Sequence, residues 1–308
     1  MSIAKYIKEI GRGKEGARSL SREQAKDLMG QILDQQVSDL EVGGFCLAMR
    51  IKGESAEEMA GFLDATHARM TLLETKQAAV VIPSYNGARK LPGLTTLLAL
   101  LLAREGQKHG FEVFVHGCQT EDSRVSTEEV FLAVNGETQV SQGIVRSRQF
   151  ENLAFVSTRQ LHLGLKALLD VRRSVGLRNS AHSLVKLMNP TTHTHSLVLS
   201  SYTHPEYLQS MTATLALTGA HALLLRGTEG EAVADPRRMP KMDGFAGGVC
   251  TSLQEAQLGV LQQLPDLPSS HDAKTCAQYT LQVLEGDKPI PTPIARQVQC
   301  VLQMLAKV

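Results

Sequence analysis

The residues best suited to chemistry stand in the segment VVIPSYNGARK at positions 80–90, where a β-branched run gives way to turn-forming residues. A loop that leaves a strand and enters a helix can bind an anion through its backbone N–H groups. Such loops are usually rich in glycine, because glycine lets the anion approach closely. This loop has one glycine, Gly87, followed by Arg89 and Lys90. The pattern favours long-range attraction of an extended polyanion over a tight cradle for a compact diphosphate.

Two further stretches are rich in cations. The N-terminal one spaces its bases as on a helix, and its candidates are Lys5, Lys8, Arg12, Lys14 and Arg18. The segment 145–190 holds eight bases and two acids, and its candidates are Arg172, Arg173, Arg178 and Lys186. Each phosphate neutralised by such a residue releases counterions, so these clusters favour salt-sensitive, sequence-independent binding of DNA or RNA. A basic helix face is also commonly just a solvated surface, and an alternative for Arg172 is an ion pair with Asp170 or another carboxylate.

Other polar groups give weaker signals. His193 and His195 alternate before a strand without a visible third ligand, so no metal site is predicted. His116 and Cys118 share one side of a strand end, yet no acid stands ready to orient them as a nucleophile pair. The catalytic residues therefore stay unknown, and no cofactor is expected.

Composition bounds the class of protein. The chain has 308 residues with a net charge of +1, and no apolar run approaches the roughly 20 residues that span a bilayer. Its five cysteines are scattered without a C-x-x-C spacing, which indicates a reduced compartment. Aromatic residues make up 4% with no tryptophan, so base stacking would contribute little. We expect a soluble, cytoplasmic protein that does not contact membranes.

The elements that position these residues follow from the hydrophobic pattern. Three capping-box signals, at Ser21–Gln24, Ser38–Glu41 and Ser55–Glu58, predict helices in the first 70 residues. A strand at 78–82, a helix at 94–104 and a strand at 111–117 form a β-α-β unit, which implies a parallel sheet. We also predict strands at 152–157, 196–202 and 221–227, and helices at 160–175, 179–188, 206–218, 272–284 and 292–306. Within the Gly- and Pro-rich region 230–270, the stretch DPRRMPKMDGFAGG (235–248) is predicted to be loop.

Several segments together resemble a known family. They are KYIKEIGRGKEGAR (5–18), RIKGES (50–55), VIPSYNGARK (81–90), VHG (115–117), VRRSVGLRNSAHSLVKLMNP (171–190), THPEY (203–207) and RGTEGE (226–231). The chain resembles the anthranilate phosphoribosyltransferases, glycosyltransferase family 3 of the nucleoside phosphorylase/phosphoribosyltransferase class. It is more similar to a bacterial branch, outside tryptophan biosynthesis, whose members bind nucleic acid and lack the transferase reaction.

The resemblance implies an α/β fold with two domains. A small all-helical domain would comprise residues 1–72, completed by helices within about 158–188. A larger α/β domain, residues 73–157 and 189–308, would hold a central, mainly parallel sheet flanked by helices. The two basic segments would then share one neighbourhood, and the protein would form a homodimer through its small helical domain, which doubles any basic patch across a two-fold axis.

The resemblance also implies a phosphoribosyl pyrophosphate cleft, which is degenerate here. The matching positions are Pro83, Ser84, Tyr85, Asn86, Gly87, Thr95, Thr96, His116, Gly117 and Arg172. Most glycines of the phosphate loop are missing, and Val115 and Cys118 replace a lysine and an asparagine. Lys186 stands where a proline lines the aromatic pocket, although Arg172 matches the arginine that faces anthranilate. The adjacent Asp-Glu pair that binds magnesium corresponds to Glu229 and Glu231, which are spaced apart and out of register.

Three hypotheses follow. The first is sequence-independent, salt-sensitive nucleic-acid binding by a homodimer on a transferase scaffold. The second is an active phosphoribosyl or glycosyl transferase with an altered aromatic or nucleobase acceptor, in which case magnesium would be needed. The third is a sensor that binds a small anion in the old cleft. The sequence leaves enzymatic activity undecided, and it does not distinguish DNA from RNA or single from double strands.

Overall fold

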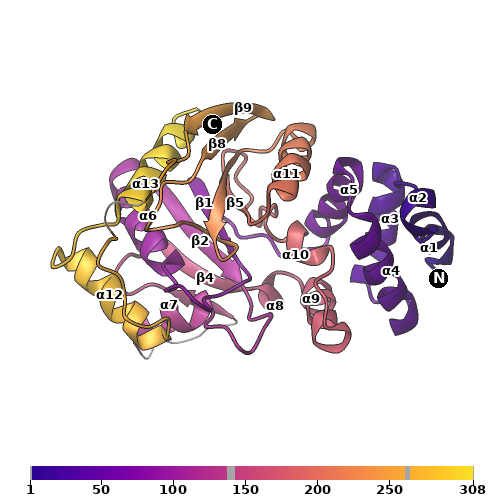
Figure 1. Cartoon of the computed structure of the whole chain (residues 1–308), viewed down its shortest axis with the longest axis horizontal. Coiled ribbons are helices and arrows are strands. Elements are labelled where there is room, and N and C mark those ends of the chain that lie inside the picture. The colour runs from indigo at the N-terminus through magenta and orange to yellow at the C-terminus, as the bar shows by residue number, and fades with distance from the viewer. Residues whose placement is uncertain (1, 137–142, 261–263, 308) are drawn as a thin grey trace.

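The computed structural model describes residues 2–136, 143–260 and 264–307. As predicted, a helical N-terminal domain adjoins a larger α/β domain with a mostly parallel sheet (Figure 1). The N-terminal helices are α1 (Ala4–Ile10), α2 (Gly13–Gly16), α3 (Arg22–Leu33), α4 (Asp39–Lys52) and α5 (Ala56–His67).

Serine caps fix where three of these helices begin. All three predicted capping boxes are present, with Ser21, Ser38 and Ser55 each accepting a hydrogen bond from the backbone N–H three residues later. Because Ser21 caps α3, that helix starts at Arg22 and excludes Arg18. Arg18 therefore does not continue a helical stripe with the bases of α3.

The helical domain has an apolar core and one buried ion pair. Phe45 and Phe62 pack edge to face with ring centroids 5.9 Å apart. The fully buried Glu58 accepts hydrogen bonds from the Lys52 ammonium at 2.6 Å and from the Leu20 N–H at 2.9 Å. Three later helices return towards this domain, namely α8 (Thr158–Leu161), α9 (Leu163–Val175) and α10 (Ala181–Leu184), with α9 packing on α3 and α10 on α5.

Within the described residues, nine strands form the sheet in the order β3-β4-β2-β1-β5-β6-β8-β9, with β7 paired to β6 outside this path. The strands are β1 (Ala78–Ser84), β2 (Phe111–Gly117), β3 (Ile144–Arg146), β4 (Leu153–Ser157), β5 (Leu197–Tyr202), β6 (Ala222–Thr228), β7 (Glu231–Ala234), β8 (Met242–Ala246) and β9 (Val249–Gln254). The central run β4-β2-β1-β5-β6 is parallel, and the strands beyond it at both edges are antiparallel.

Helices cover the sheet on both faces. The remaining ones are α6 (Thr95–His109), α7 (Thr127–Asn135), α11 (Pro205–Thr218), α12 (Ala273–Glu285) and α13 (Thr292–Leu305). Helix α6 contacts α7, α12 and α13, while α11 contacts both β5 and α5 and so joins the two domains (Figure 1). None of the helices in the described part of the chain has the length and apolarity to cross a membrane.

Most predicted elements are confirmed, and the errors are informative. The segment 235–248 is not all loop, because it contains β8, and β7 and β9 flank it. Gly247 and Gly248 both adopt positive φ between β8 and β9, as a two-residue hairpin turn requires. Pro83 does not end β1, since it pairs with His116 and the strand continues to Ser84. The predicted helix at 179–188 shortens to α10, and α7 and β3 were not anticipated.

Candidate functional site

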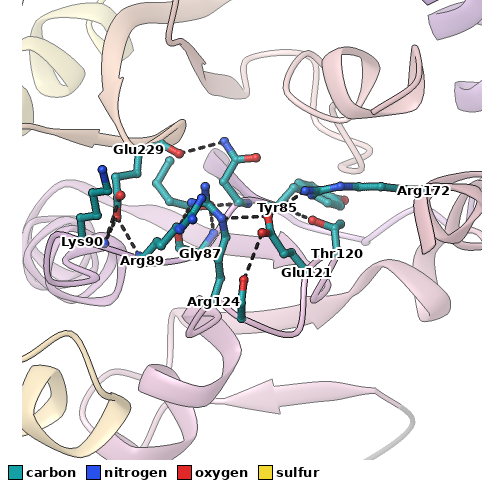
Figure 2. Close-up of polar contacts among 12 residues, drawn as sticks. Tyr85, Gly87, Arg89, Lys90, Thr120, Glu121, Arg124, Arg172 and Glu229 are labelled. Carbon is teal, nitrogen blue, oxygen red and sulfur yellow. Dashed lines mark hydrogen bonds and ion pairs between the residues drawn. The ribbon is translucent and has the colours of Figure 1, made fainter. Parts of the chain in front are cut away.

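The candidate site lies where parallel strands end beside the helical domain. Loop 84–91 leaves β1, the segment 117–126 leaves β2, and residues 203–204 join β5 to α11. The turn after β6 reaches the same region through contacts with loop 84–91 (Figure 2). Ligands of α/β proteins commonly bind outside the carboxyl ends of such strands.

Glu231 fills the first part of loop 84–91. Its carboxylate, buried with 4% of the residue exposed, accepts the N–H groups of Asn86 at 2.6 Å and Gly87 at 2.8 Å. The hydroxyls of Ser84 and Thr95 also donate to it. A side chain at Gly87 would place Cβ 2.6 Å from the Val125 carbonyl oxygen, so the loop needs glycine there.

Glu229 fills the second part of the loop. Its carboxylate accepts the backbone N–H groups of Arg89 at 2.8 Å, Lys90 at 3.1 Å and Leu91 at 3.3 Å (Figure 2). The interpretation that this loop has lost its anion cradle is therefore wrong. The backbone N–H groups still converge as in an anion-binding nest, but carboxylates of the same chain occupy them.

Tyr85 and His116 form a buried polar contact beneath the loop. The Tyr85 hydroxyl lies 2.8 Å from His116 Nδ1 and accepts a hydrogen bond from Thr158 Oγ1 at 3.0 Å. Thr120 Oγ1 donates to the Tyr85 carbonyl at 2.8 Å (Figure 2). Burial lowers the pKa of His116 to about 3, so the imidazole is neutral at physiological pH. The other cleft positions, Thr96 and Gly117, are buried.

Four arginines line a cavity of about 380 Å³ next to the loop. They are Arg89, Arg124, Arg172 and Arg178, and the cavity is also lined by Glu121, Thr203, His204 and Glu229. Glu121 accepts hydrogen bonds from Arg172 Nη2 at 2.7 Å and Arg124 Nε at 3.0 Å. The bond from Arg172 is the main reason that the pKa of Glu121 falls to about 2. We call this cavity the arginine cleft.

The arginine cleft carries uncompensated positive charge. Arg178 makes neither a hydrogen bond nor an ion pair with another described residue. Burial and the neighbouring guanidinium groups of Arg172 and Arg124 lower the pKa of Arg178. Arg172 Nη1 is buried without a hydrogen-bond partner among the described residues. An anion entering the cleft would satisfy both groups.

A second cavity of about 440 Å³ adjoins the cleft and shares Arg178, Thr203 and His204 with it. Its lining includes His182, whose pKa falls to about 3, mainly through burial. Lys186 also lines it, with a pKa lowered to about 8 by burial. The Lys186 ammonium donates to the carbonyl oxygens of Gly230 at 2.9 Å and Ser201 at 3.2 Å. Lys186 is thus held internally, and we exclude it from the phosphate-contacting set.

The remaining predicted cations are dispersed. Arg173 pairs with Asp122 at 2.7 Å, and Arg12 pairs with Glu9 at 2.8 Å. Lys5, Lys8 and Arg18 are exposed, and the Lys14 side chain lies outside the described residues.

Helices α1 and α2 pack on α4 at the outer end of the helical domain, whereas α9 packs on α3 beside the α/β domain (Figure 1). The two basic sets occupy different parts of the protomer, which corrects the expectation of one shared neighbourhood.

Sequence reasoning missed Glu121 and Arg124 as site residues. Both residues lie between β2 and α7, in a stretch whose hydrophobic residues do not repeat at helix or strand spacing. Their separation of three residues is the one feature of the sequence that could have suggested an ion pair. The roles of Glu229 and Glu231 were also missed, because their hydrogen-bond partners stand about 140 residues away in the sequence.

A magnesium ion does not fit the acidic residues as they stand. Both carboxylates of the β6–β7 turn, Glu229 and Glu231, point into loop 84–91 and accept its N–H groups. Among residues 2–136, 143–260 and 264–307 there is no group of three or more His, Cys, Asp or Glu side chains arranged to hold a metal.

Comparisons with known proteins agree with this fold. Residues 4–70 match the model of the glycosyl transferase family, helical bundle domain. The chain is 39% identical over 306 residues to the uncharacterized protein YbiB of Escherichia coli, covering 98% of this chain and 94% of that protein. It is 28% identical over 212 residues to an anthranilate phosphoribosyltransferase of Anaeromyxobacter, covering 68% of this chain and 61% of the relative.

Solved structures give the same result for the fold. The anthranilate phosphoribosyltransferase of Thermus thermophilus is 21% identical with a TM-score of 0.72, covering 95% of this chain and 85% of that one. The anthranilate phosphoribosyltransferase of Saccharomyces cerevisiae in complex with PRPP and Mg is 17% identical with a TM-score of 0.71, and the match covers 99% of this chain and 88% of that one.

Proposed function

The chain belongs to the family of YbiB, among the homologues of anthranilate phosphoribosyltransferase, and from that premise we propose that it binds nucleic acid through phosphate groups and does not transfer phosphoribosyl groups. The supporting observation is the arginine cleft, in which four arginines face two glutamates. Because Arg178 has no acidic partner and Arg172 Nη1 has no hydrogen-bond partner among the described residues, a phosphodiester would compensate both at little cost.

The occupied loop argues against phosphoribosyl transfer. A phosphoribosyl pyrophosphate molecule needs the N–H groups that Glu229 and Glu231 already use. The two carboxylates would repel its diphosphate, and they are not free to hold the magnesium that neutralises it. Binding of a polyanion in the neighbouring arginine cleft requires no such rearrangement.

A homodimer would extend the cationic surface. Three large apolar side chains of α4 are exposed, namely Leu40 at 85%, Leu47 at 44% and Ile51 at 66%. Their spacing of seven and four residues places them on one helix face, and burying such a stripe favours association. Helix α1 packs on α4, so an interface at this stripe would bring the exposed Lys8 of each protomer towards the two-fold axis.

A salt titration tests nucleic-acid binding. Fluorescence anisotropy would follow labelled single-stranded DNA, duplex DNA and RNA between about 50 and 200 mM salt, and the slope of log affinity against log salt should be about −0.7 to −0.9 per phosphate contacted. Arg178→Gln should weaken binding to every sequence and reduce that slope by about one contact. Lys274→Gln, at an exposed lysine of α12, is the matched control. An affinity that changes neither with the salt concentration nor in the Arg178→Gln variant would refute the proposal.

The names of the relatives favour a second candidate, phosphoribosyl transfer to an aromatic or nucleobase acceptor with magnesium. The loss of anthranilate fluorescence in the presence of phosphoribosyl pyrophosphate and magnesium would measure it. Turnover that disappears in Arg172→Ala would support this candidate over nucleic-acid binding, because Arg172 matches the arginine that faces anthranilate.

A further inference from the structure

A third cavity, of about 800 Å³, lies beside the carboxyl ends of β5 and β6 and the start of β8. Its volume is in the range of small-molecule sites. It shares Thr203 and Glu229 with the arginine cleft but none of the four arginines of that cleft. We call it the strand-end cavity.

The register of the sheet brings three polar side chains together at this cavity. Tyr202 of β5 pairs with Arg226 of β6, and both line the cavity. Leu225 pairs with Met242 in the antiparallel β6–β8 ladder, so Lys241, directly before β8, stands next to Arg226. Residues opposite one another in adjacent strands point to the same face of a sheet. The hydroxyl of Tyr202, the guanidinium of Arg226 and the ammonium of Lys241 therefore share one face.

Two of the cations in the lining have no partner. Two others are held by carboxylates, in the pairs Arg237–Asp235 at 2.8 Å and Lys241–Asp243 at 3.0 Å. The side chains of Arg226 and Arg238 make neither a hydrogen bond nor an ion pair with another residue in the described part of the chain. The cavity therefore has an excess of positive charge at these two arginines, which suits an anionic group with two acceptor oxygens.

The Tyr202 hydroxyl is a further donor that the protein leaves unused. Only 8% of the residue is exposed, yet its hydroxyl makes no hydrogen bond within the described residues. Burial is the main cause that raises the pKa of Tyr202, so the hydroxyl keeps its proton at physiological pH. An anion beside Arg226 would accept a hydrogen bond from this hydroxyl.

The rest of the lining is largely aliphatic. Its apolar side chains are Leu91, Pro205, Leu208, Met239, Pro240 and Leu258. Leu258 is 87% exposed, and the segment that carries it is fastened to the opposite wall, because the Gln257 N–H donates to the Met239 carbonyl at 3.0 Å. An alkyl chain laid along these side chains would remove their surface from water. Aliphatic side chains offer no stacking platform for a nucleobase, so the lining favours an alkyl body.

We propose that the strand-end cavity binds an acyl-chain carboxylate. The carboxylate head lies between Arg226, Arg238 and the Tyr202 hydroxyl, and the alkyl chain follows the aliphatic lining. Charge complementarity at one end and apolar surface along the rest define the two parts of the ligand. The site uses none of the arginines that we assign to nucleic-acid binding, so it stands or falls independently of that function.

Decanoate, kept below the concentration at which it forms micelles, is the probe, and isothermal titration calorimetry on the full chain measures its affinity. Arg226→Gln combined with Arg238→Gln should weaken decanoate binding by at least about tenfold, because it removes both charged donors. Tyr202→Phe should weaken it by at least about threefold without lowering Tm, since the hydroxyl has no partner to lose. Butyrate, with the same head and a shorter chain, should bind more weakly than decanoate.

Two control variants locate the site. Arg146→Gln combined with Arg159→Gln removes two exposed arginines elsewhere on the α/β domain and should leave decanoate affinity unchanged. Arg178→Gln, in the arginine cleft, should also leave it unchanged.

Several results would overturn the proposal. One is a wild-type protein that shows no saturable binding of decanoate. Another is decanoate binding that Arg178→Gln weakens and the Arg226→Gln/Arg238→Gln variant does not, which would move the ligand to the arginine cleft. Butyrate that binds as tightly as decanoate would remove the role of the aliphatic lining, and adenosine monophosphate that binds more tightly than decanoate would replace the acyl chain by a nucleotide. If the double arginine variant does not fold, an unchanged decanoate affinity in Tyr202→Phe counts against the proposal.

Discussion

Glu121 is the carboxylate that partly neutralises the arginines of the arginine cleft. Replacing it with a neutral side chain should change the stability of the protein and its affinity for polyanions in opposite directions. In Glu121→Gln the cleft gains one net positive charge, and Arg172 and Arg124 lose the carboxylate that each contacts at 2.7 and 3.0 Å. The variant should therefore be less stable and bind polyanions more tightly. A residue with a purely structural role would lower stability without raising affinity.

The expected loss of stability follows from the pKa of Glu121. Its pKa falls from 4.5 to about 2, and a carboxyl with a depressed pKa contributes stability above pH 4.5 that disappears as pH falls towards 2. A shift of that size corresponds to about 3 kcal/mol as an upper bound. Because 24% of the side chain is exposed, solvent screening reduces the expected loss at neutral pH to about 1–2 kcal/mol.

The expected gain in affinity follows from Coulomb's law. Removing one negative charge about 7 Å from a bound phosphate, at an effective dielectric constant of about 40, is worth about 1 kcal/mol, or roughly fivefold in affinity. Urea unfolding gives the stability, and anisotropy at low salt gives the affinity. Glu285→Gln is the charge-matched control on α12 and should change neither. An unchanged or weaker affinity in a folded Glu121→Gln protein would refute the cleft as the phosphate site.

Three further predictions concern the rest of the molecule. Leu47→Glu combined with Ile51→Glu places charge on the exposed stripe of α4 and should convert the proposed dimer to monomer in light scattering. The folded protein keeps His116 neutral down to about pH 3, whereas the unfolded chain protonates it below about pH 6.5. The free energy of unfolding of the wild type therefore falls as pH decreases through that window. In His116→Gln this part of the pH dependence of the free energy of unfolding should disappear. Glu58→Gln leaves the Lys52 ammonium buried without its partner and should cost about 3–5 kcal/mol in urea unfolding.

The outcomes that contradict these three are equally specific. Leu217→Glu places charge on an exposed leucine of α11 and should leave the oligomeric state unchanged, so equal effects of both substitutions would mean that α4 is not the interface. A His116→Gln protein with the acid profile of the wild type would show that other groups govern acid unfolding. If Glu58→Gln lowers the free energy of unfolding by less than about 1 kcal/mol, the Lys52–Glu58 pair contributes no more than an ordinary surface ion pair.

Local signals in the sequence determined much of the fold. Serine at an N-cap and a glutamate or glutamine three residues on satisfy the first N–H groups of a helix whatever lies around it, and so α3, α4 and α5 begin where predicted. The β-branched and leucine-rich runs of the central strands are buried on both faces, which made β1, β2, β4, β5 and β6 recognisable. Strand β9 lies at the edge of the sheet and is largely exposed, and β8 carries Asp243 and Gly244 in place of a β-branched run, so neither shows that pattern.

The sequence alone identified the loop after the first strand as a candidate for anion binding, and it placed Arg172 and Arg178 among the candidate phosphate-contacting cations. It could not show that Glu229 and Glu231 fill the loop, because a hydrogen bond across about 140 residues leaves no periodic trace in the chain. Tertiary packing alone decided which cations stay unpaired, since the energy of a charge depends on the distance to its neighbours and on its burial. Residue types supply the charges, and the fold decides which of them face a ligand.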